Sequence, residues 1–170
     1  MSSKILFILH LPPPIHGAAM MGKYIQESEL VNSSFDCFCI NLATAGSLSD
    51  IGHISLKKLL KYFFLLKHIS NVVREIRPEL VYITPNAGGK AFFKDFIVVQ
   101  MLKSMGCKVI AHYHNKGVSV YQSKWVYNFF YKRFFSNLKV ILLAENLYKD
   151  IAKYVKREDV FICPNGIPEE

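Results

Sequence analysis

Two patterns of hydrophobic and polar positions alternate along the chain. Short continuous apolar runs, such as Val140-Ile141-Leu142-Leu143, separate longer segments in which apolar residues recur every three or four positions. The runs predict strands at 4–9, 36–40, 80–83, 107–112, 139–143 and 160–162. The longer segments predict helices at 18–31, 55–76, 90–105, 124–136 and 145–156. Because the strand runs are continuous rather than alternating, we expect burial on both faces, as in a parallel sheet.

This order of elements predicts the fold class. Strands that alternate with helices through right-handed crossovers give an α/β fold with a doubly wound, mainly parallel Rossmann-like sheet and helices on both faces. We expect one such domain over residues 1–163. Ligands of these sheets bind beyond the carboxyl ends of the strands, which nominates the loops at 10–17, 41–54, 84–90 and 113–123 and the turn at Ala144-Glu145.

The charge is unevenly distributed along the 170 residues. The net charge is +8, but residues 51–144 alone carry fifteen bases and three acids, and 96–144 contain no acidic residue. Such a field attracts an anionic partner, which leaves nucleic acid, phospholipid headgroups and phosphorylated substrates as candidates. Lysines interrupt the most apolar segment before it is long enough to span a bilayer, so we expect a cytoplasmic protein.

The first loop is a candidate anion site. The apolar run Ile5–Leu9 breaks into a proline-rich segment that ends in His16-Gly17, and a helix is expected from Ala18. The backbone amides of a helix N-terminus and its dipole can hold a phosphate or diphosphate. The alternative is that Gly17 only allows the chain to turn. The loop has neither a G-x-G-x-x-G nor a P-loop pattern, which disfavours dinucleotides and P-loop NTPases.

The loops after the third and fourth strands hold further polar candidates. Asn86 and Lys90 follow the third strand, and His112-Tyr113-His114-Asn115-Lys116 follows or ends the fourth. Alternation along a strand places His112 and His114 on the same side, with His114 nearer the mouth of the site. A neutral imidazole there can donate to a sugar hydroxyl or a developing charge, or can simply bond a nearby carbonyl. Neither a third ligand nor a C-x-x-C pair accompanies them, so we expect no metal.

Two helices combine apolar and basic residues. In 55–76, helical spacing predicts a buried face, while Phe64 and Leu65 lie among the bases of the other face. The residues of the expected buried face are Leu56, Leu59, Leu60, Phe63, Leu66, Val73 and Ile76. The basic face suits either a membrane surface or plain solvent. The helix at 124–136 is so rich in aromatic residues that we expect burial on several sides, or a cover of lipid or another domain.

A resemblance emerges from several of these segments together. Val160-Phe161-Ile162-Cys163-Pro164-Asn165-Gly166-Ile167-Pro168 resembles the hinge between the two Rossmann-like domains of family-four glycosyltransferases, which are retaining enzymes with the GT-B fold. Pro12-Pro13-Pro14-Ile15-His16-Gly17-Ala18 is similar to the first loop of these enzymes, especially of those that build capsules and other surface polysaccharides. Thr84-Pro85-Asn86 and Ala111-His112-Tyr113-His114 also match the family pattern.

The resemblance covers only the N-terminal half of such an enzyme. It implies an acceptor-side domain over 1–163 and the start of an interdomain hinge over 164–170, with the donor-binding domain absent. The complete enzyme would be a retaining hexosyltransferase that transfers a sugar from a nucleotide-diphosphate donor, used as a substrate rather than a cofactor. His114 would be the catalytic residue near the reacting sugar. The substrate-binding residues would be His16, Gly17, Ala18, Asn86, Lys90, Asn115 and Lys116.

The implied partners follow from the same resemblance and from the charge. They are an acceptor glycan or glycolipid, the missing C-terminal domain and an anionic membrane surface, so we expect a peripheral location at the inner face of the cell membrane. The isolated chain is expected to be inactive. The main alternative is a non-catalytic basic α/β domain that binds nucleic acid or another anion, although no known nucleic-acid module is present. A stand-alone flavodoxin-like protein is a further alternative.

Overall fold

The computed structural model describes residues 2–13, 15–42 and 56–166 and shows an α/β fold. Its six parallel strands run in the order β2-β1-β3-β4-β5-β6, with helices around them, which confirms the predicted fold class. The strands are β1 (Lys4–Leu9), β2 (Asp36–Asn41), β3 (Leu80–Ile83), β4 (Val109–Tyr113), β5 (Lys139–Leu142) and β6 (Val160–Ile162). Most of the nominated loop at 41–54 and the end of the expected hinge, 167–170, lie outside the described residues.

The helices mostly begin and end close to the expected positions. They are α1 (Gly17–Glu27), α2 (Glu29–Ser34), α3 (Leu56–Ile76), α4 (Gly89–Ser104), α5 (Val118–Tyr121), α6 (Trp125–Phe135) and α7 (Tyr148–Ile151), with short 3-10 turns at Glu145–Leu147 and Arg157–Asp159. The single helix expected over 18–31 is divided at Ser28, whose backbone is extended and whose hydroxyl accepts from the Val31 amide. A serine that caps a new helix in this way ends the previous one.

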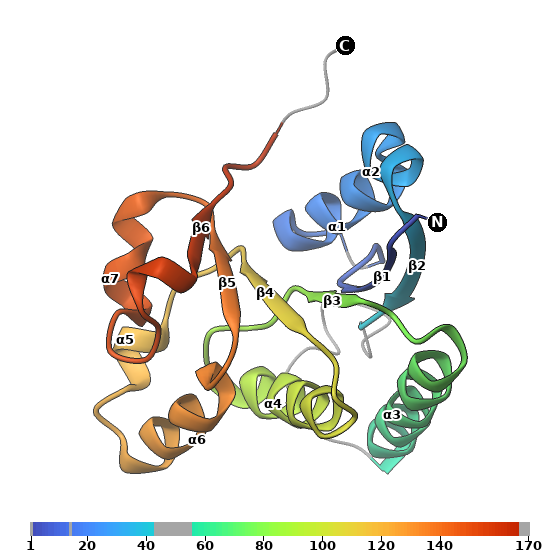
Figure 1. Ribbon diagram of the computed structural model, residues 1–170. Coiled ribbons are helices and arrows are strands. Elements are labelled where there is room, and N and C mark those ends of the chain that lie inside the picture. The colour runs from blue at the N-terminus through green and yellow to red at the C-terminus, as the bar shows by residue number, and fades with distance from the viewer. Residues whose placement is uncertain (1, 14, 43–55, 167–170) are drawn as a thin grey trace. The chain divides into compact units, whose positions relative to one another are not determined.

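The chain forms two compact units, Met1–Tyr82 and Ile83–Glu170. In the first, α1 and α2 lie on one side of β1 and β2, and α3 lies on the other (Figure 1). Leu6, Ile8 and Leu9 of β1 are fully buried at its centre. Helix α1 passes so close to the end of β1 that a side chain at Gly22 would overlap the His10 carbonyl oxygen. Glycine at this position therefore permits the contact between helix and strand.

Helix α3 does not bury the face that its periodicity predicted. Val73 is buried as expected, and Leu66 and Ile76 are half-buried, while Ile69, which the predicted face did not include, is also buried. The other four members of the predicted face, all in the first half of the helix, are exposed: Leu56, Leu59, Leu60 and Phe63. The prediction was wrong there because the apolar residues of this half spread around the helix, so spacing alone cannot select the buried arc.

The second unit is held together by an aromatic core between α4 and α6. The Phe92 ring of α4 lies 4.6 Å from Tyr131 and 5.5 Å from Phe134 of α6, measured between ring centroids. All three side chains are fully buried, and the Phe93 and Phe96 rings extend the contact to Phe130. The expectation that 124–136 is buried on several sides is thus met in the second half of α6, whereas Trp125 at its start is 81% exposed.

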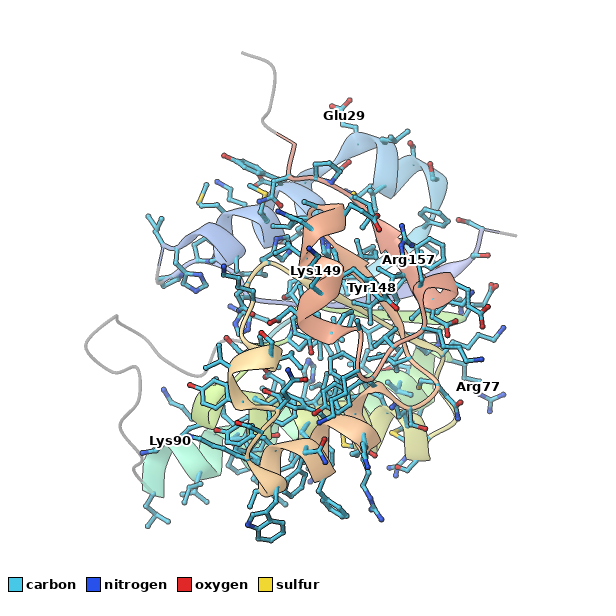
Figure 2. The ribbon with its side chains drawn as sticks, turned by 90° about the vertical axis from the view of Figure 1, so that its left-hand side faces the viewer. Glu29, Arg77, Lys90, Tyr148, Lys149 and Arg157 are labelled. Carbon is cyan, nitrogen blue, oxygen red and sulfur yellow. The ribbon has the colours of Figure 1, made fainter. Side chains whose placement is uncertain are left out.

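The ends of the elements in this unit have clear chemical causes. Helix α4 stops where expected, because Gly106 adopts a left-handed conformation and Cys107 donates to the Leu102 carbonyl. The helix expected over 145–156 is reduced to a 3-10 turn and α7. Beyond α7, Arg157 pairs with Glu145 at 2.6 Å and lies against the Tyr148 ring (Figure 2).

Candidate functional site

His16 begins α1 and caps it. Its Nδ1 accepts a hydrogen bond of 3.3 Å from the Ala19 amide, and its carbonyl accepts from Met20. The amides of Gly17 and Ala18, as the first of the helix, have no intrahelical acceptor. A Cβ added at Gly17 would meet open space, so Gly17 is not required by a close neighbour there. The loop therefore presents two backbone donors and the positive end of an 11-residue helix at the carboxyl end of β1.

The loop between β3 and α4 is fixed by a buried carboxylate. Asp95 of α4 is fully buried, and its Oδ2 accepts from both the backbone and the side-chain nitrogen of Asn86, each at 2.8 Å. Burial raises the pKa of Asp95 to about 6, although the two hydrogen bonds from Asn86 oppose the shift. Asn86 thus follows β3 as expected, but its side-chain amide is bonded to the protein itself.

The same loop is also held at its next residue. The Ala87 amide donates to Asn115 Oδ1 at 3.0 Å, and the Ala87 carbonyl accepts from the Tyr131 hydroxyl at 2.6 Å. A side chain at Gly88 would overlap the Tyr121 ring, which keeps this part of the backbone close to α5. Three elements therefore position the β3–α4 loop and, through Asn115, tie it to the loop that follows β4.

The β4–α5 loop is fixed in turn by Asp150 of α7. The Asp150 carboxylate accepts from the amides of Gly117, Val118 and Ser119 at 2.9–3.0 Å and from the Ser119 hydroxyl. Partial burial opposes its charge, but these hydrogen bonds outweigh burial and lower the pKa of Asp150. Because a carboxylate of the chain already occupies the amides at the start of α5, a phosphate ligand would have to compete with it there.

His112 and His114 lie together at the carboxyl end of β4. Their ring centroids are 4.2 Å apart, which confirms that both side chains lie on the same side. His112 is buried and interacts with the backbone of Cys163, and His114 is partly buried and approached by the side chain of Asn165. Both contacts come from the segment that follows β6, so the Pro164-Asn165-Gly166 segment begins beside the histidine pair.

The environment keeps both imidazoles neutral at pH 7. Burial, followed by the proximity of His114, lowers the pKa of His112 to about 3. Burial also lowers the pKa of His114, although Asn165 favours the charged form. Neither ring nitrogen of His114 completes a hydrogen bond within the described part of the chain. Since a buried polar nitrogen without a partner is costly, His114 is suited to bind a polar ligand that reaches this edge.

The structure places the remaining candidates at the rim of these loops. Lys90, in the first turn of α4, and Lys116, after Asn115, are exposed, and Figure 2 shows Lys90 pointing outward. Asn86 and Asn115 are brought together through Ala87, while His16, Gly17 and Ala18 form a separate group in Met1–Tyr82. Sequence reasoning missed Asp95, Tyr131 and Asp150. Its being the single acidic residue in the sequence of α4 was the only signal for Asp95.

Two further findings bear on the chemistry. Among residues 2–13, 15–42 and 56–166, no group of three or more histidine, cysteine or acidic side chains is arranged to hold a metal ion. Within the same ranges, none of the helices has the length and hydropathy needed to cross a bilayer. Comparison with models of known protein families and with curated proteins found no match.

Proposed function

We propose that this chain is the acceptor-side domain of a retaining sugar transferase with two Rossmann-like domains. The observation that carries the proposal is His114, a neutral imidazole at the carboxyl end of a parallel strand, whose ring is approached by the Asn165 side chain but whose nitrogens make no complete hydrogen bond among the described residues. The resemblance of the loops and of the segment after β6 to family-four glycosyltransferases supports the same role. In such an enzyme, His114 would contact the donor sugar near its reacting carbon.

The reaction moves one glycosyl group. The bond between the sugar's anomeric carbon and the nucleotide diphosphate breaks, and a bond from that carbon to an acceptor oxygen forms on the same face of the ring. The diphosphate departs with the electron pair of the broken bond and takes up the proton that the acceptor hydroxyl loses. The resemblance to family-four glycosyltransferases gives the N–H groups of Gly17 and Ala18 the role of stabilising the departing diphosphate. His114 would hold the sugar by hydrogen bonds that strengthen as charge develops.

The acceptor class follows from the charge. Residues 51–144 are strongly basic, which fits a diphosphate-linked glycan or glycolipid better than a neutral sugar. We therefore propose that the enzyme acts in the assembly of a surface polysaccharide or glycolipid, at the cytoplasmic face of the cell membrane.

Replacement of His114 tests the proposal directly. In the enzyme that joins this domain to its donor-binding partner, His114→Ala should lower kcat by on the order of 10²–10⁴-fold, because a positioned polar group near the reacting atoms is lost. The rate of transfer of labelled sugar from a panel of nucleotide-diphosphate sugars to membrane extracts measures this effect. The urea midpoint of the variant should change little, since the His114 ring makes no completed hydrogen bond to the described protein.

A matched variant separates this role from a general effect of losing a histidine. His68→Ala changes an exposed histidine of α3 and should retain the wild-type rate. Wild-type turnover by His114→Ala would remove His114 from the site. Turnover of any nucleotide sugar by the isolated chain would contradict the assignment to one half of a two-domain enzyme.

A further inference from the structure

The first half of α3 exposes a continuous apolar arc. Its five large side chains are all more than half exposed, with Phe63 at 61% and Phe64 at 62%; they are Leu56, Leu59, Leu60, Phe63 and Phe64. At 100° per residue they span roughly 140° of the helix circumference, away from the buried Ile69 and Val73. Large aliphatic and aromatic side chains gathered in this way mark a surface that contacts something other than water. We call these five residues the α3 arc.

The arc is confined to one half of the helix. One turn beyond Phe64 the exposed positions become polar, with Lys67, Asn71, Arg74 and Glu75. The second half of α3 is therefore an ordinary amphipathic helix, with a buried apolar face and a solvated polar one. The first half instead resembles a helix that lies in an interface, because the side that faces away from the protein is the apolar one.

The charges around the arc select its partner. Glu75 is the only acidic residue in the sequence of α3, and it lies near the end that the arc does not reach. The bases of the helix are Lys57, Lys58, Lys61, Lys67 and Arg74, and the side chains of Lys61 and Lys67 are exposed at or beside the arc. Apolar side chains flanked by bases without acids match the boundary between headgroups and acyl chains in an anionic bilayer.

We propose that the α3 arc lies in the surface of an anionic lipid bilayer. The helix axis then runs along the membrane plane, with the five apolar side chains among the upper acyl chains and Lys61 and Lys67 at the headgroup phosphates. This inference does not depend on sugar transfer, because vesicle binding can be measured without any donor or acceptor. It also selects α3 over α6, whose exposed surface offers only Trp125 and Phe129 as large apolar side chains.

Vesicle binding by the chain of residues 1–170 tests the proposal. Sedimentation with vesicles of phosphatidylglycerol and phosphatidylcholine should show binding that phosphatidylcholine alone does not support. The double variant Phe63→Ser, Phe64→Ser should weaken partitioning by on the order of 100-fold, because two exposed rings lose their burial in lipid. The double variant Lys61→Glu, Lys67→Glu should weaken it by on the order of 30-fold.

A matched control uses the same change of charge on the other helix. The double variant Lys132→Glu, Arg133→Glu replaces two exposed bases of α6 and should weaken binding by less than about threefold at physiological salt, where charges beyond the Debye length are screened. Trp125, the only tryptophan of the chain, reports on α6 directly. Its emission should not shift to shorter wavelength with vesicles, whereas a Phe64→Trp, Trp125→Phe variant should show that shift.

Four results would overturn the proposal. The first is that the chain does not bind anionic vesicles, and the second is that the α3 and α6 charge variants lose equal affinity for them. The third is a blue shift of native Trp125 while the double variant Phe63→Ser, Phe64→Ser binds as the wild type does. The fourth is tight, salt-sensitive binding to duplex DNA without vesicle binding. A dimer that Phe63→Ser, Phe64→Ser dissociates, with no affinity for lipid, would instead assign the arc to a second copy of the chain. Loss of vesicle binding would leave the His114 experiment unaffected.

Discussion

Helices α3 and α6 have similar compositions but opposite environments. Both are rich in large apolar side chains and bases, and both contain adjacent phenylalanines. In α6, Phe134 and Phe135 are buried, and Tyr131 contacts Phe92 of α4 and donates a hydrogen bond to the Ala87 carbonyl. In the first half of α3, the rings of Phe63 and Phe64 contact each other, with their centroids 6.1 Å apart. The difference shows that composition and spacing identify a helix, whereas the element that packs against the helix determines which of its residues are buried.

The largest test of this contrast is the same substitution in both helices. Phe134→Ala should destabilise the protein by about 3–5 kcal/mol, because it empties a fully buried position in the α4–α6 core. Phe63→Ala should change the free energy of unfolding by less than about 0.5 kcal/mol, since its ring is already exposed. Urea denaturation followed by circular dichroism measures both values. Equal destabilisation would show that the α3 arc is packed against protein.

Helix α4, which packs against α6, also carries the buried carboxyl group of Asp95. The contribution of Asp95 to the free energy of unfolding should therefore depend on pH. Asp95 has a folded pKa of about 6, above its usual 3.8, so it binds a proton in the folded state first and favours folding as the pH falls from 6 to 4. The depressed folded pKa values of His112 and His114 act in the opposite direction, because the unfolded chain takes up those protons first.

Asp95→Asn should therefore make stability fall more steeply on acidification, by up to about 1.4 kcal/mol per pH unit between pH 6 and 4. Urea midpoints measured from pH 4 to 7 for the wild type and the variant test the difference. Glu79→Gln, at an exposed position in the first unit, is the matched change of carboxylate to amide against which the slope of Asp95→Asn is compared. Parallel curves for wild type and Asp95→Asn would show that this carboxyl titrates normally.

A smaller effect is expected from removing one hydrogen bond of α6, the one from the Tyr131 hydroxyl to the Ala87 carbonyl. Tyr131→Phe keeps the ring in the aromatic core but removes the donor to the Ala87 carbonyl, so it should cost about 1–3 kcal/mol. Because Ala87 lies in the β3–α4 loop, amide hydrogen exchange should also accelerate around residues 86–88. A stability loss without faster exchange in this loop would mean that Asn115 and Asp95 suffice to hold it.

The fold was predictable because burial on both faces leaves continuous apolar runs. These runs located all six strands within two residues at each end, and the alternation of side chains along β4 correctly placed His112 beside His114. The residues that hold the site were not predictable in the same way. Tyr131 is hydrogen-bonded to Ala87, 44 positions away in the sequence, and Asp150 to Gly117, 33 positions away. Neither residue lies in a local sequence motif that would predict its contact. The exposed arc of α3 was missed because periodicity identifies the apolar face of a helix but not whether another element packs against that face.

The Asp150 contact has a consequence for how the protein is made. During synthesis, β4 and His114 leave the ribosome before α7 and the segment after β6. The amides of Gly117 to Ser119 therefore have no Asp150 carboxylate to bind until α7 has been made. Until residue 150 is synthesised, the β4–α5 loop lacks the hydrogen bonds that Gly117, Val118 and Ser119 donate to the Asp150 carboxylate. A chain that ends before residue 150 would therefore keep much of its aromatic core, but the loop beside His112 and His114 would lack its Asp150 contacts. This loop is then the part of the incomplete chain that proteases and chaperones would recognise.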